Sequence, residues 1–165
     1  MTDSKIRRIH HQGKVGFAVV IVMALAIAVF AGQVVMTELK DAEMDEDVDY
    51  FPPFEWVTPE EKRAEAISTG IQYMGVIALL FLGSILFKSI YHDRTPFTKM
   101  NVRLLALISL VETVLGVAEL ALILSSPLEE YTGFLLLISV AIVAYSISLI
   151  FKYGLTLQIE SDETL

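Results

Sequence analysis

Four long runs of apolar residues constrain this chain more than any other feature of its sequence. A helix needs about 20 residues to cross the hydrocarbon core of a bilayer, and each run reaches that length. Because lipid offers no partners for backbone N–H and C=O groups, isolated runs of this length must be helical. The sequence therefore predicts an all-α integral membrane protein with four transmembrane helices in an up-down bundle. The predicted spans are residues 15–36, 70–91, 102–124 and 128–153.

Composition agrees with a membrane location and excludes several kinds of site. Hydrophobic residues make up 55% of the chain and charged residues 19%, with a mean hydropathy of +0.62. Soluble domains have about 45–50% apolar and about 25% charged residues. The sequence contains no cysteine, which excludes disulfides, iron–sulfur clusters, thiolate zinc sites and cysteine nucleophiles.

The first apolar run has an alternative interpretation as a signal peptide. Basic residues precede it, and Val29-Phe30-Ala31 has the character of a cleavage site. The run is longer than the about 7–15 apolar residues of a signal peptide core, so we expect it to be retained as a span.

Charge is spread unevenly along the chain and predicts the orientation of the spans. Of the 20 acidic residues, 11 lie between Glu38 and Glu65, together with only three of the 12 bases. The other nine bases lie in the N-terminal arm, in the middle connection and at Lys152. The positive-inside rule therefore predicts that both termini and the middle connection are cytoplasmic, in the cytoplasmic (inner) membrane. Within a single membrane domain, 1–165, the connecting segments are a basic arm (1–14), an acidic extracytoplasmic segment that includes the start of the second helix (37–69), a cytoplasmic loop (92–101) and a cytoplasmic tail (154–165).

Pairs of a hydroxyl residue and proline predict where three helices begin. The segments TPEE (58–61) and SPLE (126–129) match a capping box with proline at the first helical position. Thr-Pro at 95–96 supplies the same opening without the glutamate. We expect the second, third and fourth helices to begin at these prolines, and Gly154 to end the fourth as a C′ glycine.

The stretch LVETVLGVAEL (110–120) places two carboxyl groups inside the third predicted span. At about 100° per residue, Glu119 lies about 20° from Glu112 around the helix, and Ser109 and Gly116 fall on the same side. A charge at mid-bilayer costs about 2.5–3.5 kcal/mol, so this side must face the other helices or water. We call Ser109, Glu112, Gly116 and Glu119 the polar stripe.

The polar stripe needs partners, and the sequence offers candidates in two other spans. No base lies deep enough to pair with Glu112, so we expect it to be protonated or hydrogen-bonded to hydroxyl and amide groups. The fourth span carries polar residues at a spacing of seven, and the first carries a seam of small residues with an amide near its outer end. The candidate partners are Ser139, Ser146 and Tyr153 in the fourth span, and Ala24, Ala28, Gly32 and Gln33 in the first.

The polar stripe allows three interpretations. In the first, it is a proton or cation site or a titratable switch. In the second, its neutral carboxyl groups hold the third helix to its neighbours. In the third, it contacts a partner helix. The spacing does not match a helical Glu-x-x-His metal site.

Other motifs point away from enzymes and metal sites. The acidic run DAEMDEDVDY (41–50) has acids at alternate positions, but a calcium loop that starts at Asp45 would place Tyr50 where glycine belongs and Trp56 where glutamate belongs. No Gly-rich phosphate loop, nucleophile elbow or zinc motif occurs in the sequence. We therefore expect a protein that is not an enzyme, with no metal, no cofactor and no direct contact with nucleic acid.

The end of the chain, FKYGLTLQIESDETL (151–165), is ambiguous. Apolar and polar residues alternate after Gly154, which favours an extended segment that could add to the sheet edge of a partner. Leu155 and Ile159 also fit a helical turn. A solvated, frayed tail is the third interpretation.

The chain resembles DUF2975, a bacterial and archaeal family of small four-helix membrane proteins of unknown function. The resemblance is carried by Pro96-Phe97 before the third span and by the closing run. In the closing run the matching residues are Phe151, Tyr153, Gly154, Leu157, Gln158, Glu160 and residues 162–165. Members are frequently encoded beside a small Cro/CI-type helix–turn–helix regulator, so the resemblance implies that the cytoplasmic loop and tail bind such a regulator.

Three hypotheses for function follow. The first is a membrane partner or sensor for a cytoplasmic DNA-binding regulator. The second is a small transporter or channel component, acting as a homo-oligomer, with the two glutamates on a proton or cation path. The third is a structural accessory subunit of a larger membrane complex. The first hypothesis assigns the contact surface to two groups: Arg94, Pro96 and Phe97 in the loop, and Leu157, Gln158, Glu160, Asp162 and Glu163 in the tail.

Overall fold

The chain folds into long helices, as its apolar runs predict. The computed structural model describes residues 3–46, 58–92, 96–126, 128 and 130–163. Within these residues it contains four α-helices and no strand. They are α1 (Asp3–Glu46), α2 (Pro59–His92), α3 (Lys99–Ser125) and α4 (Thr132–Glu163). All four are long and apolar enough to cross a membrane, so the chain is compatible with a multi-pass membrane protein.

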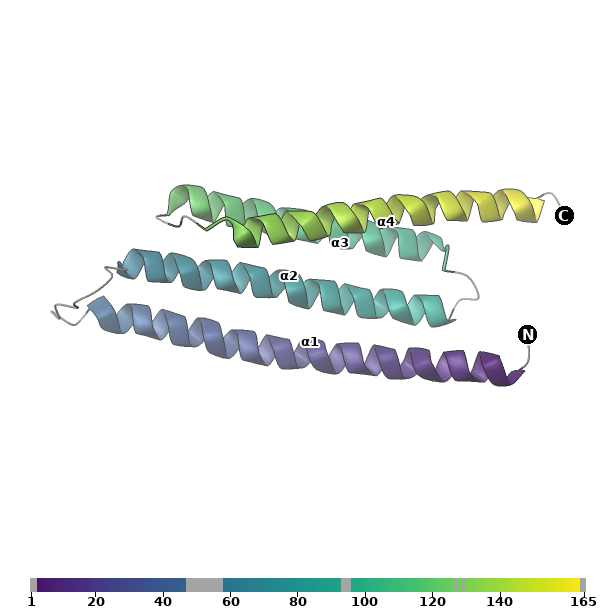
Figure 1. Ribbon diagram of the computed structural model, residues 1–165, viewed down its shortest axis with the longest axis horizontal. Helices are drawn as coiled ribbons and strands as arrows, with labels where there is room; N and C mark the ends of the chain where they lie inside the picture. Colours follow the sequence, from purple (N-terminus) through teal and green to yellow (C-terminus); the bar gives the residue numbers. More distant parts are fainter. Residues whose placement is uncertain (1–2, 47–57, 93–95, 127, 129, 164–165) are drawn as a thin grey trace.

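Consecutive helices run antiparallel, so that both termini lie at one end of the molecule together with the connection between α2 and α3 (Figure 1). We call this end the basic end, because Lys14, Lys88, Lys99, Arg103 and Lys152 lie toward it. The opposite end holds the α1–α2 and α3–α4 connections.

The four helices do not close into a bundle, in contrast to the expected architecture. Among the described residues, α1 packs along α2 alone, α3 packs against α4, and α2 bridges the two pairs. The contact between α2 and α4 is short. An open arrangement is possible because lipid covers the uncovered helix faces as well as another helix would.

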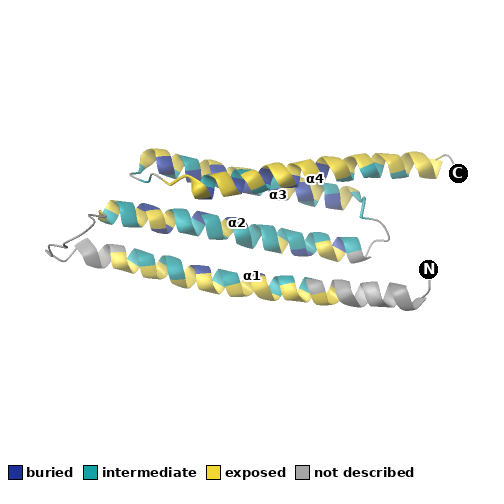
Figure 2. Ribbon diagram, viewed as in Figure 1, coloured by how far each residue is buried: buried dark blue, intermediate teal, exposed yellow. Residues whose placement is uncertain are grey.

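Many large apolar residues are exposed, as a lipid environment allows (Figure 2). Val22 of α1, Leu124 of α3 and Ile142 of α4 are examples of exposed apolar residues. Among the described residues, the largest fully buried side chains are polar, namely Glu112, Glu119, Asn101 and Ser84. The interior between the helices therefore combines small and apolar residues with a few fully buried polar side chains.

Helix α2 begins where the sequence predicts, with Thr58 as its cap. The Thr58 Oγ1 accepts a hydrogen bond from the backbone N–H of Glu61 at 3.2 Å, and its carbonyl accepts one from Lys62. The helix then continues through Gly70 without interruption to His92.

The predicted starts of α3 and α4 were wrong. Helix α3 begins at Lys99, because Thr98 is its N-cap and accepts a hydrogen bond from the backbone N–H of Asn101. Helix α4 begins at Thr132 and not at residue 127, because Ser126 is used as the C-cap of α3. The carbonyl of Tyr131 accepts the first bond of α4, from the N–H of Leu135.

The sequence also predicted that Gly154 ends α4, and this prediction was wrong. The helix runs on through residues 155–163, so the tail is helical rather than extended or frayed. Gly154 serves close packing instead: a Cβ atom there would lie 2.6 Å from Cδ1 of Phe97. The glycine therefore lets the segment before α3 lie directly on α4.

Candidate functional site

The polar stripe of α3 lies largely inside the molecule. Glu112 is 2% exposed and Glu119 is 1% exposed, and Gly116 between them is also buried. Ser109 is only half-buried, and its carbonyl accepts a hydrogen bond from Thr113 of the same helix. The two carboxyl groups thus face other helices, and Ser109 lies at the border of the stripe.

Glu119 is held in a hydrogen-bonded cluster with two residues of α2. The Ser68 hydroxyl donates to Glu119 Oε1 at 2.5 Å, and the Gln72 amide donates to the same oxygen at 3.2 Å. The Gln72 amide also lies 3.1 Å from Ser68 Oγ. Ser68 and Gln72 are four residues apart and so share one face of α2. We call Ser68, Gln72 and Glu119 the polar cluster.

The first turn of α4 covers the polar cluster through a glycine. A Cβ atom on Gly133 would lie 2.6 Å from Cδ of Gln72 and 2.7 Å from Oε1 of Glu119. Real Cβ atoms do not approach other atoms this closely, so only glycine fits at this position without a shift of the cluster. Three helices therefore meet at the polar cluster, and α4 approaches it backbone first.

Glu112 lies seven residues before Glu119 on α3, at the same interface with α2 and α4. A Cβ atom on Gly75 of α2 would lie 2.9 Å from Glu112 Oε2 and would overlap Leu137 of α4. Glu112 Oε1 is buried and has no hydrogen-bond partner within the described part of the chain. The same holds for Glu119 Oε2. Each glutamate therefore keeps one buried oxygen that no described group satisfies.

Apolar side chains of α4 separate the two glutamates. A Cβ atom on Gly116 would lie 2.8 Å from Cδ1 of Ile138 and 3.6 Å from Cβ of Leu137. Ile138 thus fills the space beside the glycine that lies between the carboxyl groups. The polar stripe is continuous along α3, but Ile138 of α4 lies in front of it between the two carboxyl groups.

The partners expected from the sequence were wrong. Ser139, Ser146 and Tyr153 of α4 are exposed, and the Ser146 hydroxyl bonds the Ile142 carbonyl of its own helix. The packed face of α4 carries other residues at spacings of three and four, namely Gly133, Leu137, Ala141, Ala144 and Ser148. In α1, Ala24 and Ala28 turn toward α2, but Gly32 and Gln33 are exposed, and this helix does not reach α3.

The residues that the sequence analysis missed are on α2. Ser68, Gln72 and Gly75 follow the i, i+4, i+7 spacing of a single helix face, which is a recognisable signal. Ser68 was assigned to the extracytoplasmic segment, outside the second span, and so was not considered as a partner. A search for polar and small residues at helical spacing across the whole of α2 would have found this face.

A second group of candidate residues meets at the basic end. The Phe97 ring packs edge-to-face on Phe151, with ring centroids 5.5 Å apart, and covers Gly154. Asn101 is fully buried and donates from its side chain to the Pro96 carbonyl at 2.8 Å. The structure thus brings together Pro96-Phe97 and the start of the closing run.

The tail beyond this contact is a helix with a largely exposed surface. Leu157, Glu160, Asp162 and Glu163 are exposed, and Gln158 is half-buried. Arg94 lies outside the described residues, as do residues 47–57 of the acidic segment. Within the described ranges, no group of three His, Asp or Glu side chains is placed to hold a metal ion.

Comparisons with known proteins assign no identity. No family model, no curated protein and no solved structure matches the chain. The geometry of its own residues is therefore the basis for a function.

Proposed function

We propose that this chain is a multi-pass protein of the cytoplasmic membrane, with both termini in the cytoplasm, that binds and restrains a small Cro/CI-type helix–turn–helix regulator. The contact surface consists of Pro96 and Phe97 before α3 and of the α4 tail from Gly154 onward. Nine bases lie on the proposed cytoplasmic side against three on the other, which supports this orientation.

The packing of Phe97 on Phe151 and Gly154 carries the proposal. It joins a loop and a tail that are far apart in sequence into one unit at the basic end. The tail presents exposed Leu157 and Ile159 beside acidic residues, on a helix that continues past the apolar part of α4. Apolar side chains on a helix that leaves the bilayer are costly in water and are suited to a protein partner.

Helix α4 also supports a sensing role. It is unbroken from Gly133, which covers the polar cluster, to the exposed tail. A helix of 32 residues spans about 48 Å. Any event that repacks Gly133 against Glu119 therefore displaces the same rigid element that carries the proposed contact surface.

Capture of the regulator from membranes tests this function. The full chain and the double variant Leu157→Asp/Ile159→Asp are each co-expressed with a regulator, and the share of regulator in the membrane fraction is measured. We expect the double variant to release most of the regulator, because two exposed apolar contacts become charged. The matched control Thr156→Asp adds a charge on the same turn and should retain the regulator. Equal membrane fractions for all three chains would reject the proposal.

A proton or cation path is the second candidate function. The observation in its favour is that Glu112 and Glu119 each have a buried oxygen with no partner in the described part of the chain. Ile138 and Leu137 argue against it, because they divide the space between the two carboxyl groups. Flux measured in proteoliposomes discriminates the two functions: Glu112→Gln and Glu119→Gln abolish flux through a path, whereas a regulator partner shows no flux in any variant.

A further inference from the structure

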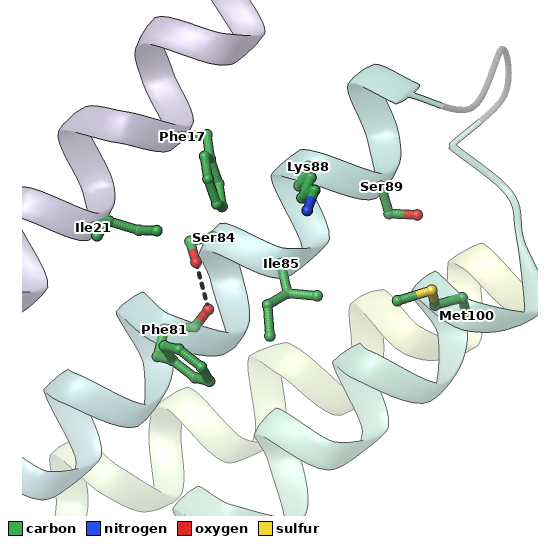
Figure 3. Close-up of a pocket in the computed structure, with 8 residues that line it drawn as sticks. All are labelled: Phe17, Ile21, Phe81, Ser84, Ile85, Lys88, Ser89 and Met100. Carbon is green, nitrogen blue, oxygen red and sulfur yellow. Dashed lines mark hydrogen bonds between the residues drawn. The ribbon is translucent and has the colours of Figure 1, made fainter.

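A groove opens on the face of α2 that lies between α1 and the start of α3 (Figure 3). Its volume is about 390 Å³, which lies in the range of about 300–1,000 Å³ typical of sites for small ligands. Phe17 and Ile21 project from α1 toward α2, and Met100 borders the groove from α3. The lining residues from α2 are Phe81, Ser84, Ile85, Lys88 and Ser89.

The open packing of the fold creates this groove. Because α1 packs on α2 and does not reach α3, none of the three helices that contact α2 covers this strip of its surface. The wall formed by α2 offers no free hydroxyl group at Ser84. This residue is 1% exposed, and its hydroxyl donates to the Phe81 carbonyl at 2.7 Å. The groove therefore suits a hydrocarbon chain rather than a polar solute.

A base stands at the end of the groove nearest the membrane boundary. Phe17 lies near the start of the first apolar run (15–36), and Lys88 lies near the end of the second (70–91). The Lys88 ammonium lies 5.9 Å from the centroid of the Phe17 ring, a cation–π distance that holds it over the groove. Lys99 and Arg103 follow on α3, in a neighbouring hollow that shares Met100 with the groove.

We propose that this groove binds one anionic phospholipid from the surrounding leaflet. One acyl chain lies along Phe81, Ile85 and Ile21, and the phosphate of the headgroup meets Lys88 at the level where headgroups begin. Charge complementarity selects the occupant, because Lys88 ends an otherwise apolar groove and further bases lie beside it. Access is lateral from the bilayer, so a lipid needs no opening through the protein.

Native mass spectrometry of the delipidated full chain tests the proposal. The protein is incubated with equal amounts of phosphatidylglycerol and phosphatidylcholine of the same acyl length, and the ratio of bound lipids is measured. Lys88→Gln should reduce the preference for phosphatidylglycerol about fivefold, the effect of one base near an anionic surface. Lys88→Arg should keep the preference. The matched control Lys152→Gln removes an exposed base at the same end of the molecule that does not line the groove, and it should also keep the preference.

A second variant tests the position of the acyl chain. Ile85→Trp fills the apolar part of the groove without changing charge, so it should lower the amount of the first bound lipid several-fold. Unchanged lipid binding by Ile85→Trp would overturn the proposal. An equal loss of preference in Lys88→Gln and Lys152→Gln would overturn it as well, because headgroup selection would then reflect only the general charge of the basic end.

Discussion

The two faces of α2 pack in opposite ways. Toward α3 and α4 it presents Gly75, which allows close approach, and Ser68 and Gln72, which donate hydrogen bonds to Glu119. Toward α1 it presents polar side chains near its start and apolar side chains farther along, where part of this side stays open as a groove. One face is held by interhelical hydrogen bonds, and the other packs along much of α1 but leaves a groove accessible to lipid near the basic end.

The difference between the faces follows from the physics of the bilayer. Apolar contacts give little reason for helices to associate in lipid, because lipid tails are as apolar as leucine. Small residues and interhelical hydrogen bonds therefore fix the pairing of helices. The polar cluster, together with Gly75 and Gly133, defines how α2, α3 and α4 pack together, whereas α1 packs along α2 but leaves a groove near the basic end.

Replacing Gly133 by leucine should give the largest loss of stability. Its side chain would overlap Gln72 and Glu119, so that either the polar cluster or the start of α4 must move. Overpacking of this kind costs about 1–3 kcal/mol, and the broken hydrogen bonds add to it. The free energy of unfolding, measured by titration with SDS in mixed micelles, should fall by about 3 kcal/mol.

Gly83→Leu is the matched control for that variant. A Cβ atom on Gly83 meets no other atom within 4 Å, so leucine at this position has open space. We expect its unfolding free energy to stay within about 0.5 kcal/mol of the parent chain. Similar losses for both glycine variants would show that α2 does not have one closed and one open face.

The two buried glutamates should respond differently to leucine. Glu119→Leu leaves Ser68 and Gln72 without their acceptor and should cost about 1–2 kcal/mol. Glu112→Leu removes a carboxyl group of which one oxygen has no described partner, so its stability should be equal to or higher than that of the parent. The same SDS titration measures both, and Ser146→Ala is the control for loss of a hydroxyl that bonds only its own helix. Equal losses at both glutamates would mean that Glu112 also holds helices together.

The sequence alone predicts the positions of the helices, because an apolar run long enough to cross the bilayer must be helical. Their full lengths were not predictable, since α1 (44 residues) and α2 (34 residues) continue well beyond the predicted spans. The start of α2 was also predictable, since Thr58 and Pro59 supply a cap and a first turn with no competing use. The starts of α3 and α4 were not, because each region holds more than one hydroxyl residue and the pattern does not say which one caps which helix. Thr98 takes that role before α3, and Ser126 closes α3 instead of opening α4.

The partners of the polar stripe could not be predicted, although its burial could be expected. A narrow polar stripe on an apolar helix must face protein, whichever helix that is. Which helix it faces depends on helix pairing, and the pattern along α3 carries no information about that. Ser139 and Ser146 have the right chemistry and the right spacing, but they lie on the face of α4 that points away.

The smallest expected effect concerns the contact between the Phe17 ring of α1 and the Lys88 ammonium group of α2, which lies at the groove. A double-mutant cycle of Phe17→Leu and Lys88→Gln measures the coupling between the ring and the ammonium group. The distance of 5.9 Å and the exposed position of Lys88 predict a coupling of about 0.5 kcal/mol, typical of a solvated cation–π pair. A coupling as large as that between Ser68 and Glu119, measured by the same titration, would contradict the contrast between the faces. It would mean that the contact between Phe17 and Lys88 holds the open part of the α1–α2 interface as firmly as the polar cluster holds α2 to α3.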